Sequence, residues 1–402
     1  MCQQLRISDR AGRVIASPIR KFFPLALAAE RQGVTVLKVN VGDSDIPAPA
    51  AFWRALKNYP GTGLNYAPSA GLRKHALAWV KYFASFGVTL QPEQIIPTVG
   101  CAEAMLFVLM AVADPGDEIL VFEPLYSSYK GFAAMLNIRL VPVTLRVENN
   151  FSLPLEKEIC KKITRRTKAL VVINPNNPTG TVLTARERAM VGRIARKHHL
   201  FVIVDETYRE IIFFGPPSTF LNLPGLREHV IVIDSVSKKF SCPGARVGCV
   251  ASFNPAVMSA MLRFAMVRLS VGTLEQHSLV PLLSRAKTFS GKITREYKKR
   301  RDVVYAALKK IPGVVCHKPH GALYLIAKLP LDDAEKFVKF LLTEFRWHGT
   351  TVLVTPAHDF YLTPGLGRNE IRIAYVLNVR LLQKAMVILQ HGLRAYQKKY
   401  AA

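Results

Sequence analysis

Three apolar runs that end abruptly in polar residues constrain the fold more than any other feature. They are ALVVINPNNPTG at 169–180, LFVIVDETY at 200–208 and VIVIDSVSK at 230–238. Continuous Val and Ile residues of this length are typical of strands buried on both faces, as in a parallel sheet covered by helices. The segment between the first two runs has Thr184 as a candidate N-cap and Glu187 three residues later, which predicts a helix. The alternation predicts an α/β fold with a doubly wound, mostly parallel sheet.

The length of the chain predicts a large domain and a smaller α/β lobe. Its 402 residues are half apolar, enough for a sizeable core. We expect the large domain over residues 45–285, and a small domain formed by residues 1–44 and 286–402. A long amphipathic helix should open the C-terminal part, and strands should follow around GALYLIAKL (321–329) and EIRIAYV (370–376).

The formal net charge of +27 raises the question of a nucleic-acid partner. The basic clusters at 160–168, 193–199 and 295–302 are spread along the chain and interleaved with apolar residues. In the last cluster, helical spacing puts Tyr297 and Val304 on one face and the lysines and arginines opposite. Solvated helix faces therefore account for the charge, and we expect no nucleic-acid partner. A basic regulator with an inactive enzyme fold stays an alternative, which steeply salt-dependent DNA binding would support.

The cysteines and the apolar segments bear on the compartment. The cysteines are scattered without close metal-type pairs: Cys2, Cys101, Cys160, Cys242, Cys249 and Cys316. We expect free thiols and no metal site. No apolar stretch is long enough to span a bilayer, and the N-terminal residues lack the apolar block of a signal peptide. We expect a soluble, cytoplasmic protein without a membrane partner.

Polar side chains gather where the three predicted strands end. They are Asn177, Asp205, Tyr208, Ser235, Ser237 and Lys238. Taken singly, each has a simpler interpretation as a turn residue or a surface lysine. Because ligands of open α/β sheets bind beyond the carboxyl ends of the strands, the six together predict a functional site.

At this point the sequence resembles the pyridoxal-phosphate-dependent aminotransferases of fold type I, class I/II, and most closely those of prokaryotic aspartate aminotransferase type. The resemblance runs from about Asn40 to Leu377. It is carried by these motifs: YAPSAGLR (66–73), TVGCAEA (98–104), EPLYSSY (123–129), NPNNPTG (174–180), DETY (205–208), SVSKKFSCPGARVG (235–248) and IRIAY (371–375). It implies a mostly parallel sheet sandwiched by helices, with pyridoxal 5'-phosphate as the cofactor.

The resemblance also implies roles around the cofactor ring. Lys238 would be the catalytic amine, forming the lysine-bound aldimine and later moving the proton. Asp205 would face the pyridine nitrogen and keep it protonated, so that the ring accepts electrons. Asn177 and Tyr208 would donate hydrogen bonds to the phenolate oxygen of the ring. Tyr126 would lie against one ring face.

The phosphate of the cofactor needs several donors. The resemblance assigns them to two hydroxyls, a guanidinium and the backbone just before an apolar helix: Ser235, Ser237, Arg246 and Gly100-Cys101-Ala102. Tyr66 in relatives reaches the phosphate from the partner subunit, so the resemblance implies a homodimer with shared active sites. Lys239, the second lysine of the pair, would be structural or would lie near the phosphate.

The substrate contacts are less fully specified. Arg372, expected at the end of a strand, would clamp the α-carboxylate of the substrate, with Asn177 beside it. Gly42 would allow a close approach of backbone to substrate, or would be an ordinary glycine between strand and turn. A distal carboxylate would be met by a cation for which the sequence leaves three candidates open: Arg268, Lys130 and Arg20.

The expected function is transfer of an amino group from a 2-amino acid to a 2-oxo acid by a ping-pong mechanism. Aspartate and glutamate are the favoured donors. Neutral or aromatic donors stay open, as do a β-lyase and a decarboxylase, because one scaffold supports several reactions.

Overall fold

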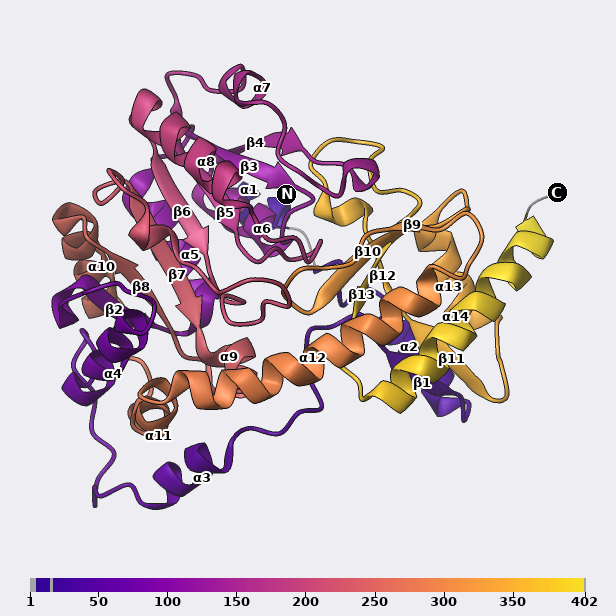
Figure 1. Ribbon diagram of the computed structural model, residues 1–402, viewed down its shortest axis with the longest axis horizontal. Coiled ribbons are helices and arrows are strands. Elements are labelled where there is room, and N and C mark those ends of the chain that lie inside the picture. Colours follow the sequence, from indigo (N-terminus) through magenta and orange to yellow (C-terminus); the bar gives the residue numbers. More distant parts are fainter. Residues whose placement is uncertain (1–4, 15–16, 401–402) are drawn as a thin grey trace.

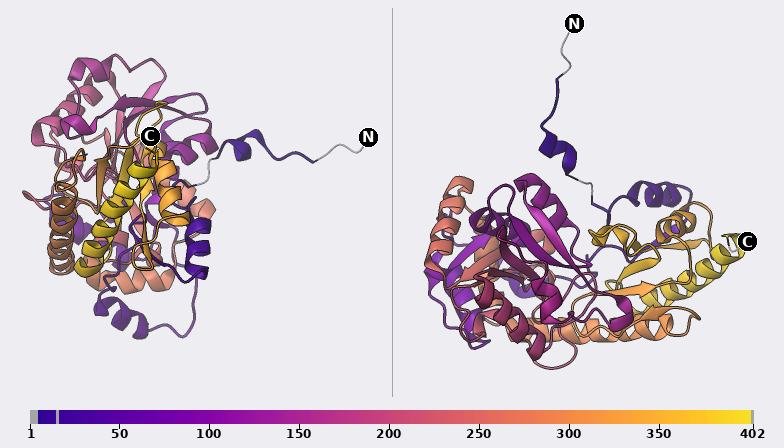
Figure 2. Two further views of the ribbon diagram at one scale, coloured as in Figure 1. Left: turned by 90° about the vertical axis from the view of Figure 1, so that its right-hand side faces the viewer. Right: turned by 90° about the horizontal axis from the view of Figure 1, so that it is seen from above.

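The computed structural model describes residues 5–14 and 17–400. Two lobes are evident, each built around its own sheet, and the long helix α12 (Ala286–Leu308) runs along both (Figure 1). The segment that carries α1 (Asp9–Arg13) reaches away from this body in both views of Figure 2. None of the helices in the described ranges is long and apolar enough to cross a membrane.

The larger lobe contains a seven-stranded sheet with the order β2-β8-β7-β6-β5-β3-β4. Only β8 pairs antiparallel with its neighbours, so the predicted mostly parallel sheet is confirmed. The strands are β2 (Ile95–Thr98), β3 (Glu118–Glu123), β4 (Arg139–Thr144), β5 (Thr167–Ile173), β6 (Phe201–Asp205), β7 (Val230–Ser235) and β8 (Gly248–Ser252).

The three predicted apolar runs form β5, β6 and β7, which lie side by side at the centre of the sheet. Asp205, the last residue of β6, is in register with Ile173 on β5 and with Ile233 on β7. The three strands therefore end at the same edge, and the polar residues that follow them are brought together there.

Helices cover both faces of this sheet. One face packs on α5 (Gly100–Val112), α6 (Ser128–Leu136) and α10 (Pro255–Arg268). The other packs on α4 (Arg73–Ala84), α8 (Ala185–His198) and α11 (Thr273–Leu283). At the start of α8, the predicted Thr184 cap and its reciprocal bond with Glu187 are both present.

Several short elements complete the larger lobe and its borders. Two helices are α3 (Ala50–Lys57) and α7 (Glu156–Cys160). A single turn of helix, α9 (Val236–Lys239), follows β7 directly. The 3₁₀ turns are η1 (Pro92–Gln94), η2 (Val147–Asn149), η3 (Phe220–Asn222), η4 (Pro243–Ala245) and η5 (His358–Phe360).

The smaller lobe combines both ends of the chain. Its four-stranded sheet has the order β12-β13-β10-β9, and a separate parallel pair joins β1 to β11. The strands are β1 (Thr35–Lys38), β9 (Val315–Cys316), β10 (Tyr324–Lys328), β11 (Thr350–Leu353), β12 (Thr355–Pro356) and β13 (Glu370–Ala374). The helices are α2 (Phe23–Arg31), α13 (Ala334–Thr343) and α14 (Val379–Tyr400). The predicted domain limits at residues 45 and 285 stay a prediction.

Helix α12 confirms the predicted long amphipathic helix but corrects its polar face. Tyr297 and Val304 are buried as expected. Arg300 and Arg301, expected in solvent, are buried as well. Arg300 is paired with Asp45 at 2.7 Å, and the Arg301 Nη1 donates to a backbone carbonyl at 2.6 Å. Hydrophobic periodicity assigns every charge to solvent and therefore misses buried ion pairs.

The cysteines are free, as expected, wherever the structure describes them: Cys101, Cys160, Cys242, Cys249 and Cys316. Cys2 lies outside the described residues.

Candidate active site

A cavity of about 680 Å³ lies at the edge of the large sheet, and residues of both lobes line it. The predicted residues in its lining are Gly42, Cys101, Ala102, Tyr126, Asn177, Asp205, Tyr208, Ser235, Ser237, Lys238, Arg246 and Arg372. The structure thus brings these residues together around one cavity, while their individual roles stay predictions. Gly100 and Tyr66 were also predicted for the site but are absent from this lining.

Lys238 lies in the α9 turn, just beyond the end of β7. Ser235 caps this turn by accepting a hydrogen bond from the Ser237 N–H. The Lys238 Nζ donates to the carbonyl oxygen of Gly42 at 2.7 Å. The pKa of Lys238 is lowered to about 8, mainly by burial; the carboxylate of Asp43 opposes this shift, and the charges of Arg372 and Arg246 add to it. About a tenth of this amine is therefore unprotonated, and nucleophilic, at pH 7, far more than for a lysine with the ordinary pKa.

Asp205 closes β6 with its carboxylate inside the cavity. Its Oδ2 accepts a hydrogen bond from the Tyr129 hydroxyl at 2.7 Å, and its Oδ1 accepts from the Thr207 N–H at 3.0 Å. Burial raises the pKa of Asp205, while the hydrogen bonds from Thr207 and Tyr129 oppose that rise. A cation bound against this carboxylate would favour its ionised form.

Arg372 presents a guanidinium that is almost fully buried yet borders the cavity, with 1% of the residue exposed. It lies in the middle of β13 rather than at the expected strand end. Its Nη1 donates to the Asn177 Oδ1 at 3.0 Å, and its Nη2 donates to the Asn40 carbonyl at 2.5 Å. Because the Asn177 oxygen accepts from Arg372, its amide nitrogen is left as the donor.

Two hydroxyls and a guanidinium lie beside the start of α5. The Ser235 and Ser237 Oγ atoms are 2.7 Å apart. Arg246 donates to the carbonyl of Pro243 at 3.0 Å and also borders the cavity. Gly100 is the first residue of α5 rather than preceding it, and a Cβ there would lie 2.7 Å from the Arg246 Nη2. Gly100 therefore leaves room for the Arg246 guanidinium.

Tyr208 and Gly42 meet a residue that the sequence analysis did not single out, Tyr324 of β10. The Tyr208 and Tyr324 hydroxyl oxygens are 3.1 Å apart, and their rings meet edge to face. A Cβ on Gly42 would overlap the Tyr324 hydroxyl. The glycine is therefore required by close packing against Tyr324, and the predicted approach of its backbone to a substrate stays a prediction.

The three cations considered for a distal carboxylate differ in position. Arg20 lines the cavity. Lys130 donates to the Tyr361 carbonyl at 2.6 Å and lies outside the lining. Arg268 donates to the Pro97 carbonyl at 3.2 Å and is likewise outside it. Arg20 is the one candidate of the three that borders this cavity.

Neither Tyr66 nor Lys239 lines the cavity. Tyr66 is 84% exposed on the surface. Lys239 is fully buried behind the α9 turn, so it is not near a phosphate bound in the cavity. Its structural interpretation is the one that the packing supports.

Other cavity residues were not predicted as site residues: Tyr129, Thr207, Tyr324, Asp43, Ser128 and Phe132. Tyr129 and Thr207 belong to the quoted motifs EPLYSSY and DETY, so their position in those motifs was an available signal. Tyr324 comes from a strand of the other lobe, and only the way in which the two lobes are joined reveals it.

Pyridoxal phosphate, which the resemblance implies, can be tested against the chemistry of this cavity. The cofactor has an aldehyde, a protonatable ring nitrogen and a phosphate dianion. The cavity offers an amine on Lys238, a buried carboxylate on Asp205, and a group of hydroxyl and guanidinium donors beside the N-terminus of a 13-residue helix. The groups present fit the cofactor.

Comparison with known proteins supports the same identification. Residues 34–387 match the family model for aminotransferases of class I and II. An aspartate aminotransferase of Pyrococcus horikoshii is 28% identical over 386 residues, which cover 94% of this chain and 95% of the relative. Aromatic-amino-acid aminotransferase 2 of Thermococcus litoralis is 28% identical over 95% of this chain and 97% of its own.

A solved structure of an alanine aminotransferase from Pyrococcus furiosus superposes with a TM-score of 0.89 and 29% identity, covering 97% of this chain and all of that one. The matches include aspartate aminotransferases, as the resemblance implied, and they confirm the fold-type-I architecture. The chain belongs to the class I and II aminotransferases, enzymes that use pyridoxal 5'-phosphate as their cofactor.

Proposed function

We propose that this aminotransferase takes its amino group from aspartate or glutamate and passes it to a 2-oxo acid by a ping-pong mechanism. The observation that carries the proposal is the charge of the cavity. Its cations are Arg20, Lys238, Arg246 and Arg372, and its carboxylates are Asp43 and Asp205. An excess of cations favours a doubly anionic cofactor tail together with a substrate that carries two carboxylates.

When bound, pyridoxal phosphate supplies an electron sink that stabilises negative charge at the substrate carbon. The Lys238 amine, with its lowered pKa, holds the cofactor and later carries the proton at its Nζ. The Asp205 carboxylate pairs with the ring nitrogen, and the Tyr129 hydroxyl orients that carboxylate. Asn177 and Tyr208 donate to the ring oxygen.

Anion binding is divided among the remaining groups. Ser235, Ser237, Arg246 and the first turn of α5 bind the phosphate. Arg372, held by Asn177 and by the Asn40 carbonyl, orients its fork toward the α-carboxylate of the substrate. This leaves Arg20 without an assigned anion, and we assign it to the distal carboxylate of the substrate.

A second candidate is an aminotransferase for aromatic or other neutral amino acids. Ile19 and Phe132 also line the cavity and give it apolar surface, and Ile19 is the chain neighbour of Arg20. The two candidates differ in whether the distal group of the substrate meets a charge or an apolar side chain.

The test is a half-reaction screen with single amino acids and no 2-oxo acid, following the absorption band of the lysine-bound cofactor. Aspartate and glutamate should discharge that band fastest. A charge-assisted hydrogen bond contributes about 1.5–3 kcal/mol, so Arg20→Met should slow aspartate by about ten- to a hundredfold. The same variant should leave alanine nearly unchanged, and Lys130→Met is the matched control. A wild-type enzyme that prefers aromatic donors would contradict the acidic-substrate proposal and leave the reaction class intact.

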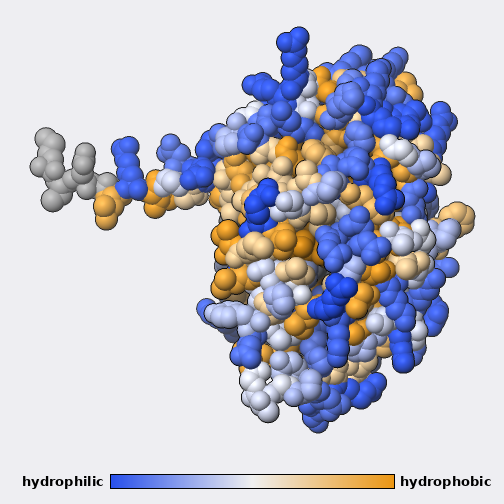
Figure 3. All heavy atoms as spheres, turned by 90° about the vertical axis from the view of Figure 1, so that its left-hand side faces the viewer, coloured by the Kyte–Doolittle hydropathy of each residue, from blue (hydrophilic) through white to orange (hydrophobic). Residues whose placement is uncertain are grey.

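A homodimer with shared active sites is the second part of the proposal. Tyr66 is exposed, and so are Leu64, Val267 and Leu269. The Thr273 Oγ1 donates to the Asn65 carbonyl, so the loop that carries Tyr66 lies close to the start of α11, which follows α10 in the chain. Figure 3 shows apolar residues gathered on the face of the molecule where α10 lies. A second copy of the chain covering this face would bury these side chains and bring Tyr66 to a neighbouring cavity.

A further inference from the structure

The second lysine of the Lys238-Lys239 pair lies on the side of the turn opposite the cavity. Lys239 is 0% exposed. Its Nζ donates to both carboxylate oxygens of Asp234, at 2.8 and 2.7 Å, and to the Tyr82 hydroxyl. A lysine ammonium carries three N–H donors, and these three contacts engage all of them.

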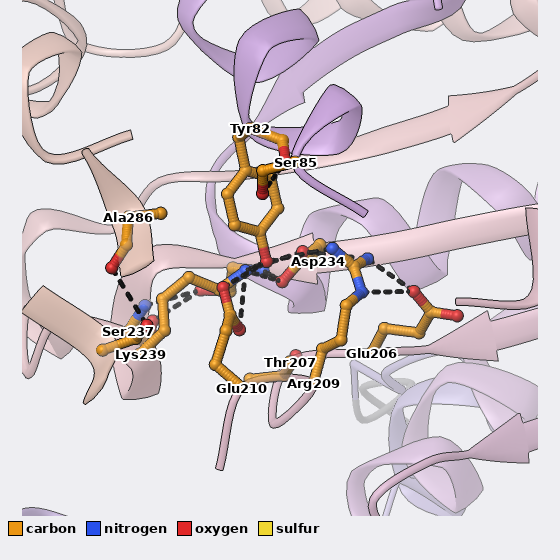
Figure 4. Close-up of polar contacts among 12 residues, drawn as sticks. Tyr82, Ser85, Glu206, Thr207, Arg209, Glu210, Asp234, Ser237, Lys239 and Ala286 are labelled. Atoms are coloured by element: carbon orange, nitrogen blue, oxygen red, sulfur yellow. Dashed lines mark hydrogen bonds and ion pairs between the residues drawn. The ribbon is translucent and has the colours of Figure 1, made fainter. Parts of the chain in front are cut away.

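The contacts continue into a buried group of charges (Figure 4). The Arg209 guanidinium is fully buried, with its Nε 2.7 Å from Glu206 and its Nη2 3.2 Å from Asp234. Its Nη1 donates to the Tyr82 hydroxyl at 2.9 Å, and that hydroxyl donates to Glu210 at 2.5 Å. We call the following six residues the charge cluster: Tyr82, Glu206, Arg209, Glu210, Asp234 and Lys239.

The charge cluster lies directly behind the cavity because neighbouring residues alternate between the two. In each of three adjacent pairs, one residue lines the cavity and the other belongs to the cluster: Asp205 and Glu206, Ser235 and Asp234, Lys238 and Lys239. Extended backbone at the ends of β6 and β7 accounts for the first two pairs. Lys238 and Lys239 lie in the α9 turn, where successive side chains project about 100° apart around the helix axis. The cluster therefore joins the end of β6, the end of β7 and the α9 turn, three segments that carry cavity residues.

Stability alone is a poor reason for such a cluster. Removing charges from water is costly, and well-packed apolar side chains of similar volume often stabilise a fold as well as a buried ion pair does. Directional contacts, by contrast, fix the backbone from which a neighbouring side chain projects. The adjacency of Lys239 to Lys238 makes the direction of the Lys238 side chain the property that the cluster controls.

We propose that Lys239, through its ion pair with Asp234, is a positioning residue that orients Lys238 and the Ser235 and Ser237 hydroxyls toward the cofactor. The ion pair of Lys239 with Asp234 would also make the protein selective between the two adjacent amines, Lys238 and Lys239. An ammonium whose donors are all engaged has no lone pair for an aldehyde, so the cofactor bonds to Lys238 alone. The inference rests on the cofactor role proposed for Lys238.

The first test compares Lys239→Met with a matched variant, Arg301→Met. Arg301 is 4% exposed and paired with Asp302 at 2.8 Å, and it belongs to neither the charge cluster nor the cavity lining. Cofactor-free protein is titrated with pyridoxal phosphate, and the pH midpoint of the band of the lysine-bound cofactor is measured. Lys239→Met should weaken binding by at least about tenfold, or about 1.4 kcal/mol, and shift the midpoint. Arg301→Met should lower the unfolding temperature and change neither.

Two outcomes overturn the inference: an unchanged affinity and midpoint in Lys239→Met, or an equal loss of affinity in Arg301→Met. Lys239→Met leaves the Asp234 carboxylate buried without its closest cation, which can prevent folding. The double variant Asp234→Asn/Lys239→Met removes both charges. The Ser235 N–H donates to the Asp234 Oδ1 at 2.6 Å in the wild type, and the amide oxygen of the asparagine can accept that bond in the variant. The double variant should show the same loss of at least about tenfold, and wild-type affinity in it contradicts the proposal.

Selectivity is tested in Lys238→Ala protein that is incubated with pyridoxal phosphate, reduced with borohydride and mapped by peptide mass. Lys239 should carry no label, and a label there overturns the selectivity claim. In the wild-type protein the same reduction must label Lys238, and a label elsewhere would defeat the proposed site instead. If the wild-type protein is labelled at Lys238 but Lys239→Met and Asp234→Asn/Lys239→Met bind the cofactor with normal affinity, the positioning role of Lys239 is contradicted and the proposed function is not.

Discussion

The Nζ of Lys238 donates a 2.7 Å hydrogen bond to the carbonyl oxygen of Gly42, which lies 196 residues earlier in the chain. Gly42 follows β1 of the smaller lobe, whereas Lys238 follows β7 of the larger one. The amine that we assign to the cofactor is therefore held between the two lobes. Its direction depends on how the lobes are joined as well as on the sheet that carries it.

Loading of the cofactor should depend on pH through Lys238. Burial lowers the pKa of Lys238 to about 8. Below that pH the amine is an ammonium without a lone pair, so the rate of cofactor capture should rise with pH and level off above about pH 8. Stopped-flow absorbance at a series of pH values measures this curve.

The charge of Arg372 contributes to the same curve. Because burial first and then the charge of Arg372 lower the pKa of Lys238, Arg372→Met should move the curve to higher pH. Arg372→Lys keeps the charge and should leave the curve close to that of the wild type, although it loses the planar fork. Identical curves for Arg372→Met and wild type would contradict the electrostatic account.

Gly42→Ala should damage the site by steric overlap. The added Cβ would overlap the Tyr324 hydroxyl, and overpacking of this kind costs about 1–3 kcal/mol. The matched control is Gly244→Ala, a second cavity glycine where a Cβ would meet nothing within 4 Å. The unfolding temperature and the cofactor affinity should both fall in Gly42→Ala and stay unchanged in Gly244→Ala. A similar loss in Gly244→Ala would contradict steric overlap with Tyr324 as the cause.

Asp205→Asn should reduce turnover by at least about a hundredfold, because the neutral amide no longer pairs with a protonated ring nitrogen. Steady-state turnover of the variant and of the wild type measures this loss.

Tyr129→Phe should reduce turnover less than Asp205→Asn does. It removes a hydrogen bond that lowers the pKa of Asp205, so that pKa, already raised by burial, should rise further. The carboxylate would then be lost at a higher pH as the solution is acidified. Steady-state rates between pH 5 and 8 test this. If activity is lost at the same pH in Tyr129→Phe as in the wild type when the solution is acidified, the role assigned to Asp205 and Tyr129 is contradicted.

Shared active sites can be tested by mixing two inactive variants. Tyr66→Ala and Lys238→Ala homodimers should each have little activity. In a hybrid dimer, one site combines the intact Lys238 of one subunit with the intact Tyr66 of its partner. Random reassortment should therefore restore about a quarter of the wild-type sites. Absence of any recovery, with hybrid formation confirmed by native mass spectrometry, would argue against the shared site.

Much of this arrangement was predictable from the sequence. Runs of Val and Ile fixed the central strands, and the polar residues after them, Asn177, Asp205 and Lys238, converge because parallel strands end at one edge. The cap of α8 at Thr184 was equally readable, since the capping box is a local signal.

The remainder depends on contacts between distant segments. Tyr324 enters the cavity from the smaller lobe, and Arg20 reaches it from the N-terminal segment. Lys239 and Arg300 are charged residues that are buried by ion pairs with acids, and hydrophobic periodicity assigns such residues to solvent. The choice among Arg20, Lys130 and Arg268 likewise required knowing which backbone carbonyls Lys130 and Arg268 bind.

The central claim is that one amine at the edge of the sheet, that of Lys238, bonds to the cofactor. The most direct measurement is borohydride reduction of the wild-type holoenzyme followed by peptide mapping, with Lys238→Ala protein treated in parallel. The account predicts a single labelled lysine at position 238 and loss of the cofactor absorption band in the variant. A label on another lysine, or a variant that keeps both its band and its turnover, would contradict it.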